Sequence, residues 1–141
     1  CGYIDKSGKI IINYQFDKVL LDLTNQNSDD LKLSFDTSGE YNQNSSTYDL
    51  VFVTKVYNDN DTEDAFLNIQ CKGTFKFENI DSFENIPDFF YRNSIAILFP
   101  YVRAYISLIT TQANTKGIIL PTLNLSHLES ELRKNTSKKQ A

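Results

Sequence analysis

Apolar and polar residues alternate with a period of two through the first half of the chain, which is typical of strands with one covered face. Leu31, Leu33 and Phe35 alternate with polar neighbours and predict an amphipathic strand. The apolar runs at 10–16 and 19–23 are two further short candidates. Asn, Asp, Ser and Gly residues separate these runs, so this half of the chain predicts several strands joined by turns.

The segment 48–57 is rich in β-branched and aromatic residues, which strands favour. Asparagine and aspartate residues follow it and supply a turn, and residues 65–77 are the partner strand. The two segments predict the strongest hairpin in the chain. Asp59, Asp61 and Asp64 lie in the turn, but the glycine and glutamate of a calcium loop are missing, which favours a solvated turn.

From Ser82 onward the apolar period changes to three and four residues, the spacing of a helix with one buried face. The stripe comprises Phe83, Ile86, Phe90, Ile97, Leu98, Tyr101, Val102, Tyr105, Ile106 and Ile109. Pro87 fits the first turn of a helix, whereas Pro100 predicts a kink or the start of a second helical segment. Residues 114–117 supply the stop.

The chain after this helix predicts an extended apolar connection over 117–125. Ser126 and Glu129 have the spacing of a capping box, which predicts a short final helix. Residues 135–141 are expected to form a flexible tail. Strands followed by helices predict an α+β fold.

Composition and charge narrow the class of protein. The 141 residues are 40% hydrophobic and 23% charged, which predicts a globular chain with one core. A net charge of −4 and a pI near 4.9 disfavour nucleic acid as the main partner. Since no apolar run approaches the ~18 to 20 residues of a membrane span, no membrane insertion is expected.

The cysteines and the single histidine predict no metal site. Cys1 and Cys71 lie far apart in the sequence and, with His127 alone, cannot complete a zinc site, so a reducing, cytoplasmic compartment is expected. A disulfide between the two cysteines stays open at this level. The chain contains no methionine, so Cys1 marks a processed or trimmed beginning, either a mature lipoprotein or a truncation.

The residues carry no recognisable catalytic constellation. No nucleophile with a base, no paired carboxylates and no phosphate-binding glycine loop have the required spacing, so we expect no enzyme and no cofactor. His127 follows a predicted helix cap and is interpreted as an exposed first-turn residue. Tyr101, Arg103 and Tyr105 alternate along the helix, where core packing with one ion pair is favoured over ligand binding.

Two stretches carry a family resemblance. Residues 93–103, NSIAILFPYVR, and residues 120–125, LPTLNL, resemble the most recognisable segments of the SecB family of export chaperones. The similarity runs from about Gln15 to Leu132. Upstream it includes residues 32–37, 48–56, 65–67 and 73–75, which resemble the second, third and fourth strands of the family.

The resemblance implies a four-stranded antiparallel sheet with the helices on one face, assembled as a dimer of dimers. It implies an ATP-independent holdase that binds unfolded polypeptides, either exported preproteins or a dedicated client such as an antitoxin. The alternative is a SecB fold used as a docking or assembly module without chaperone activity, and a small-molecule binder or enzyme is a third possibility.

The resemblance also assigns residues by position. It places client binding at Leu31, Leu33, Phe35, Ile118, Ile119 and Leu120. It places the oligomer interface or the core at Phe99, Pro100, Tyr101, Arg103 and Tyr105. Apolar residues that alternate on a strand are also the pattern of an ordinary core.

Departures from the family concern the translocase motor SecA. The acidic pair of the first strand corresponds to Lys18 and Asp22, and the acidic position of the fourth strand to Ile69. Asp22 and Leu67 are the remaining motor-docking candidates. Since these positions carry little acidic charge, weak or absent SecA binding is expected, and an antitoxin-type partner fits better.

The resemblance divides the chain into three parts. Residues 1–14 are a β segment whose start, Gly2 to Ile10, resembles part of a bacterial WG-type repeat. Residues 15–134 are the SecB-like domain, and 135–141 are the tail.

Overall fold

The protein is described by a computed structural model, which describes residues 9–26, 30–59, 64–77, 82–113, 117–120 and 127–138. The strands are β1 (Lys9–Leu21), β2 (Leu31–Asn42), β3 (Thr47–Asn58), β4 (Leu67–Phe77) and β5 (Thr136–Lys138). The helices are η1 (Leu23–Asn25), η2 (Phe83–Asn85), α1 (Asp88–Gln112) and α2 (His127–Lys134). Predictions for Cys1, residues 114–116, Pro121 and the Ser126 cap lie outside the described residues.

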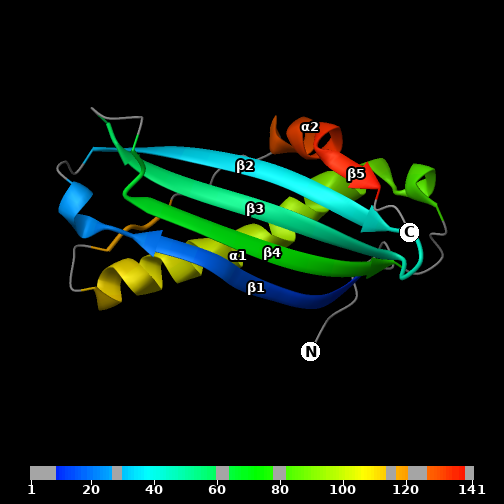
Figure 1. Cartoon of the computed structure of the whole chain (residues 1–141), viewed down its shortest axis with the longest axis horizontal. Helices are drawn as coiled ribbons and strands as arrows, with labels where there is room; N and C mark the ends of the chain where they lie inside the picture. The colour runs from blue at the N-terminus through cyan, green and yellow to red at the C-terminus, as the bar shows by residue number, and fades with distance from the viewer. Residues whose placement is uncertain are drawn as a thin grey trace.

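The strands form one mixed sheet in the order β1-β4-β3-β2-β5 (Figure 1). The first four strands in this order are antiparallel neighbours, and the predicted hairpin of 48–57 with 65–77 is confirmed as β3 with β4. The expected four-stranded antiparallel sheet is wrong by one strand, because β5 adds to β2 in parallel over three residues.

β5 forms because polar side chains anchor the residues after α2. The Gly39 N–H donates to the Asn135 carbonyl at 3.2 Å, and the Asn135 side-chain amide donates to the Thr37 carbonyl at 3.0 Å. The Tyr48 hydroxyl lies 2.5 Å from the Thr136 hydroxyl, which also donates to a carbonyl of α2. Residues 136–138 of the expected tail are therefore part of the sheet.

β1 joins the two strands expected at 10–16 and 19–23. The register with β4 shifts between Ile11 and Asn13 and again between Phe16 and Lys18. A bulge inserts an extra residue and resets which side chains face each side of the sheet. The pattern along β1 therefore looks interrupted in the sequence although the strand continues.

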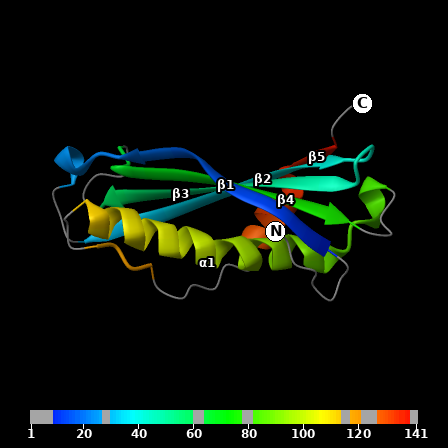
Figure 2. The ribbon, with the colours of Figure 1, turned by 90° about the horizontal axis from the view of Figure 1, so that it is seen from below.

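The core lies between one face of the sheet and α1 (Figure 2). Alternate residues of β3 are buried on this face, including Tyr48, Leu50 and Phe52. β4 repeats the pattern, and its buried aromatic side chains pack edge-to-face on Phe90 of α1. We call this the covered face, and the other side of the sheet the open face.

α1 is one continuous helix with Pro100 inside it, so no second segment begins there, and Pro87 is the residue that precedes the first turn. Proline has no N–H, and the carbonyl of Ala96, four residues earlier, has no helical donor at this point. Ala96 and Pro100 are both exposed, so water can satisfy that carbonyl.

The expectation that no apolar stretch reaches membrane-spanning length is corrected by α1. The helix is long and apolar enough by length and composition, with a mean hydropathy of 1.4 over its best window. Part of that window, 39%, is buried inside the protein. Packing against the sheet accounts for that buried part of its apolar sequence.

α2 is tied to the start of α1 by Arg133. Its guanidinium lies 3.3 Å from the Asp88 carboxylate and 3.6 Å from that of Glu129, and it stacks 5.1 Å from the Tyr91 ring centroid. Burial raises the pKa of Tyr91, and the Arg133 charge opposes that shift. His127, at the first position of α2, is exposed as predicted.

Gly73 of β4 marks a close approach of α1 to the sheet. A Cβ atom at this position would lie 2.8 Å from Cδ1 of Leu98 and 3.0 Å from Cδ2. Leu98 is fully buried, so it has little space into which it could move. We predict that Gly73→Ala lowers the free energy of unfolding by roughly 1 to 3 kcal/mol, because overpacking forces core side chains apart.

Urea denaturation measures this cost. Lys76→Ala, on the open face of the same strand, is the matched control and should change stability by less than about 0.5 kcal/mol. Equal stability of Gly73→Ala and the parent protein would show that α1 does not press on β4 there.

Cys71 is a free, fully buried thiol on β4, and it forms no disulfide among the described residues, which do not include Cys1. Burial raises its pKa to about 11 from an ordinary value of 9.0; the Asp17 charge raises it further, and a backbone hydrogen bond from Gln15 opposes the shift. The thiol loses its proton at a lower pH in the unfolded chain than in the folded protein. The free energy of unfolding should therefore decrease as the pH rises from 9 to 11.

Denaturation midpoints measured between pH 8 and 11 test this, with Cys71→Ala as the comparison. The pKa values of Tyr48 and Tyr91 are also raised, so both tyrosines lower the stability at high pH. They do so equally in the parent protein and in Cys71→Ala. The midpoint of Cys71→Ala should therefore fall less steeply above pH 9. Parallel profiles would show that the thiol does not couple to folding.

Candidate binding surfaces

A half-buried apolar row lies on the first half of β2. Leu31, Leu33 and Phe35 point to the covered face and pack against the core without being enclosed by it. The Phe35 ring centroid lies 5.8 Å from that of Phe52 and 6.0 Å from that of Phe99. We call these three β2 residues the edge row.

Phe35 also connects two sets of predicted site residues. It was a client-binding candidate, whereas Phe99 was a candidate for the oligomer interface or the core, and the two rings are in contact. Phe99 is buried and belongs to the core. The edge row therefore lies at the margin of the core, where its three side chains are partly accessible to solvent.

Two buried polar atoms lie beside the edge row. Thr54 pairs with Phe35 across the strands, and Thr37 is the next β2 residue on the same face. The hydroxyls of both threonines are buried without a hydrogen-bond partner among the described residues. Such groups are uncommon in cores, and this pair marks a region where hydrogen bonding is not saturated.

The segment 117–120 contains the other client-binding candidates. Gly117 has a φ of +61°, a left-handed conformation that favours glycine, and it turns the chain after α1. The Ile118 N–H donates to the Thr110 hydroxyl at 2.8 Å, which holds the segment on the end of α1. Ile119 is 76% exposed, whereas Leu120 is buried in the core, so the three differ sharply in access to solvent.

Aromatic pairs join β1 to α1. Tyr14 stacks on Tyr101 with ring centroids 4.4 Å apart, and Phe16 stacks on Tyr105 at 4.1 Å. The sequence reasoning singled out the two helical tyrosines but missed their partners on β1. The alternation of Tyr14 and Phe16 within the run 10–16 is the signal that could have found them.

Several apolar residues are exposed on the outward side of α1, next to the exposed Arg92. Phe89, Ala96, Pro100, Ala104 and Leu108 are exposed and share one side of the helix. We call these residues the outer stripe. Leu108 is 54% exposed, far more than a core residue would be.

Arg103, the remaining predicted interface residue, is half-buried on the same helix. No ion pair of Arg103 occurs within the described part of the chain. The ion pair favoured for it in the sequence analysis is therefore not formed among those residues. Pro100 and Tyr101 are exposed.

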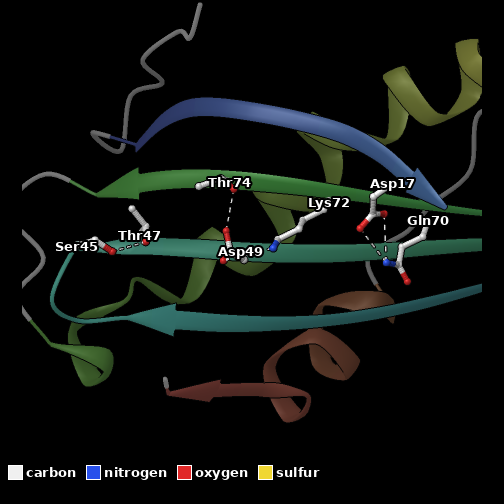
Figure 3. A network of polar contacts seen from close by, with 7 residues as sticks. All are labelled: Asp17, Ser45, Thr47, Asp49, Gln70, Lys72 and Thr74. Atoms are coloured by element: carbon white, nitrogen blue, oxygen red, sulfur yellow. Dashed lines mark hydrogen bonds and ion pairs between the residues drawn. The ribbon is translucent and has the colours of Figure 1, made fainter. Parts of the chain in front are cut away.

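The open face of the sheet is polar, and several of its side chains pair with each other (Figure 3). The Thr74 hydroxyl donates to Asp49 at 2.8 Å, and Lys72 lies 4.0 Å from the same carboxylate. The Gln70 amide donates to Asp17 at 3.2 Å. A depression on this face is lined by Lys18, Val19, Leu20, Asp36, Val53, Lys55, Asn68 and Gln70.

The motor-docking candidates are not grouped on this face. Asp22 accepts a hydrogen bond from the Thr24 N–H at 3.1 Å and caps η1. Leu67 and Ile69 are fully buried on the covered face. The described residues contain no cluster of three or more metal-ligating side chains.

This geometry defines a class of protein, an α+β fold whose sheet is covered on one face only and whose core is open along one strand. A profile of the preprotein translocase subunit SecB family matches residues 16–135. The chain belongs to the SecB family.

A relative and a solved structure agree with this assignment. The uncharacterized protein MJ0357 of Methanocaldococcus jannaschii is 31% identical over 118 residues, covering 78% of this chain and 75% of that protein. The Mycobacterium tuberculosis SecB-like chaperone Rv1957, solved in complex with a ChAD peptide from the HigA1 antitoxin Rv1956, is similar in fold. Its TM-score is 0.66 at 13% identity, over 82% of this chain and 88% of that one. The predicted family and α+β class are confirmed.

Proposed function

We propose that this protein is a cytoplasmic, ATP-independent holdase that binds unfolded or extended polypeptides without a cofactor or a catalytic step. The observation that carries the proposal is the edge row, an apolar strip that belongs to the core but is only half covered. Membership of the SecB family and the structural similarity to a chaperone with a bound antitoxin peptide support it.

The physical basis is burial of apolar surface. An extended segment that covers Leu31, Leu33 and Phe35 removes apolar area from water at roughly 25 cal/mol per Å². One such contact is weak, and several contacts in an assembly add by avidity. This would let the protein hold unfolded chains while rejecting folded ones, whose apolar side chains are already buried.

A dedicated client such as an antitoxin fits this chain better than docking to SecA during export of preproteins. The open face carries Lys18 and Lys55, and neither lysine pairs with a carboxylate in the described part of the chain. Leu67 and Ile69 face the core. The acidic surface that the family resemblance implies for the motor is therefore weakly developed.

A docking module without chaperone activity is the alternative, and it would use the same apolar surfaces to hold a permanent partner. An exposed apolar stripe on the longest helix is a typical binding surface for a permanent partner. We propose that a second copy of this chain covers the stripe, in a dimer or a dimer of dimers. The protein would then use the outer stripe for assembly and the edge row for clients.

Leu33→Asn tests the client surface. We predict that it weakens binding of an unfolded model protein roughly tenfold, because the contact loses most of one buried leucine. Binding is measured by calorimetry with the same model protein unfolded and folded, and the folded form should not bind. Phe35 is less suitable, because its ring packs on Phe52 and Phe99 and a polar residue there would disturb the core.

Ser34→Asn is the matched control, since its side chain points to the opposite face of the same strand. It should bind like the parent protein. Equal binding by both variants would remove the edge row from the client surface, and failure of the parent protein to bind either form would favour the docking module.

Leu108→Glu tests assembly through the outer stripe. We predict that the mass measured by light scattering falls from an oligomer to a smaller species, because a charge in an apolar interface is desolvated without a partner. Lys76→Glu on the open face is the control and should leave the mass unchanged. A monomeric parent protein would contradict the proposal directly.

A further inference from the structure

The backbone of β2 has an uncovered edge directly beside the edge row. The Gly39 N–H and the Thr37 carbonyl both bond to Asn135, so they point away from β3. In an antiparallel pair, alternate residues direct both backbone groups to the same side. The N–H and C=O groups of Leu31, Leu33 and Phe35 therefore point outward as well.

β5 covers only the far part of this edge. It pairs with Gly39 to Tyr41, and the Asn135 amide occupies the carbonyl of Thr37. Within the described ranges, β2 has no strand neighbour along residues 31–36 on this side. The inner side of the strand is fully paired, from Leu31 with Asn58 onward.

The pattern of these groups selects the chemistry of the partner. Donors and acceptors repeat every second residue, about 6.6 to 6.8 Å apart, and another extended backbone has the same repeat. Side chains of an added strand would alternate between the two faces. Those on the covered side would lie beside Leu31, Leu33 and Phe35, where they could share the same apolar contacts.

We propose that an extended client segment binds as an additional β-strand on residues 31–36 of β2, through backbone hydrogen bonds as well as side-chain burial. The inference rests on the proposed function and specifies how that site holds its client. We call this stretch of β2, residues 31–36, the seat. Backbone hydrogen bonds do not depend on side-chain identity, so the seat can accept many sequences, and the edge row selects apolar residues at alternate positions.

The length of the seat favours a short flexible segment over a folded partner. Asn135 and β5 close the edge at one end, which leaves about six residues, roughly 20 Å of strand. A second copy of this chain would bring a strand of 12 or 13 residues, about twice the length of the uncovered edge. β5 is itself a short segment seated on the same edge, which shows that the edge accepts an added strand.

N-methylated peptides test the inference without changing any side chain. The probe is a labelled peptide of alternating leucine and serine residues between lysine pairs, made in three forms. The parent form is unmodified, the second is N-methylated at every leucine and the third at every serine. N-methylation removes the backbone donor, and binding to the full chain is measured by fluorescence anisotropy.

Strand addition predicts that one methylated form loses roughly tenfold or more in affinity, whereas the other stays within about twofold of the parent form. With the leucines on the covered face, leucine methylation is damaging if the added strand is antiparallel and serine methylation if it is parallel. Affinity losses that are equal for the two forms, or absent from both, would overturn strand addition and leave the proposed function standing.

The remaining outcomes are also informative. If an unfolded model protein binds and the parent peptide does not, the short seat on β2 is overturned. If neither binds, the proposed function itself fails.

A pair of protein variants gives a second measurement. Leu33→Pro removes one outward N–H that makes no bond within the sheet, and proline is tolerated on strand edges. Leu33→Ala removes the side chain alone. Leu33→Pro should bind the parent peptide several-fold more weakly than Leu33→Ala, with circular dichroism confirming that both fold. Equal binding by two folded variants would overturn the inference.

Discussion

Packing of one helix against one face of the sheet is the constraint on which the rest of the structure depends. α1 crosses the covered face at Gly73, where the absence of a Cβ lets Leu98 approach the backbone of β4. This contact fixes the spacing of the two layers, and the alternating aromatic residues of β3 and β4 fill the space between them. With a single long helix, the layer cannot cover the whole width of the sheet. The strands at either side are therefore only half covered, and the apolar residues available for binding occur on those strands.

The two outer strands of the antiparallel part of the sheet, β1 and β2, are stabilised in different ways. β1 is held by stacking of Tyr14 and Phe16 on α1, although no strand pairs with its outer edge in the described part of the chain. β2 is closed over a few residues by β5 and by the amide of Asn135. An uncovered strand edge invites unwanted pairing with other chains, and proteins ordinarily limit its length. Here the limit is set by residues after α2, so the last segment of the domain defines how much of the edge remains open.

Much of the fold could be predicted from periodicity, and the failures have local causes. The period of two on β3 and the period of three to four on α1 are long and regular, because a covered sheet and a core helix impose them directly. β1 was divided in two because a bulge near Asp17 resets the alternation. β5 was missed because it depends on hydrogen bonds of Asn135 and Thr136 to residues about a hundred positions earlier, which no local pattern reveals.

At the candidate site, the sequence placed Leu33 and Phe35 on one strand face, but burial of Leu120 beside an exposed Ile119 depends on how the chain crosses the end of α1.

Pro100 has a consequence for any surface that covers α1. The carbonyl of Ala96 has no helical donor, and it lies among the apolar residues of the outer stripe. An entirely dry contact over this stripe would strand that oxygen without a hydrogen bond, at a cost comparable to a lost backbone bond. Whatever covers the helix must therefore bring a donor or retain a water molecule at this point. Because of the proline, the apolar outer stripe contains one carbonyl oxygen that needs a hydrogen-bond donor. A partner that supplies this donor would therefore fit the stripe better than one that is only apolar.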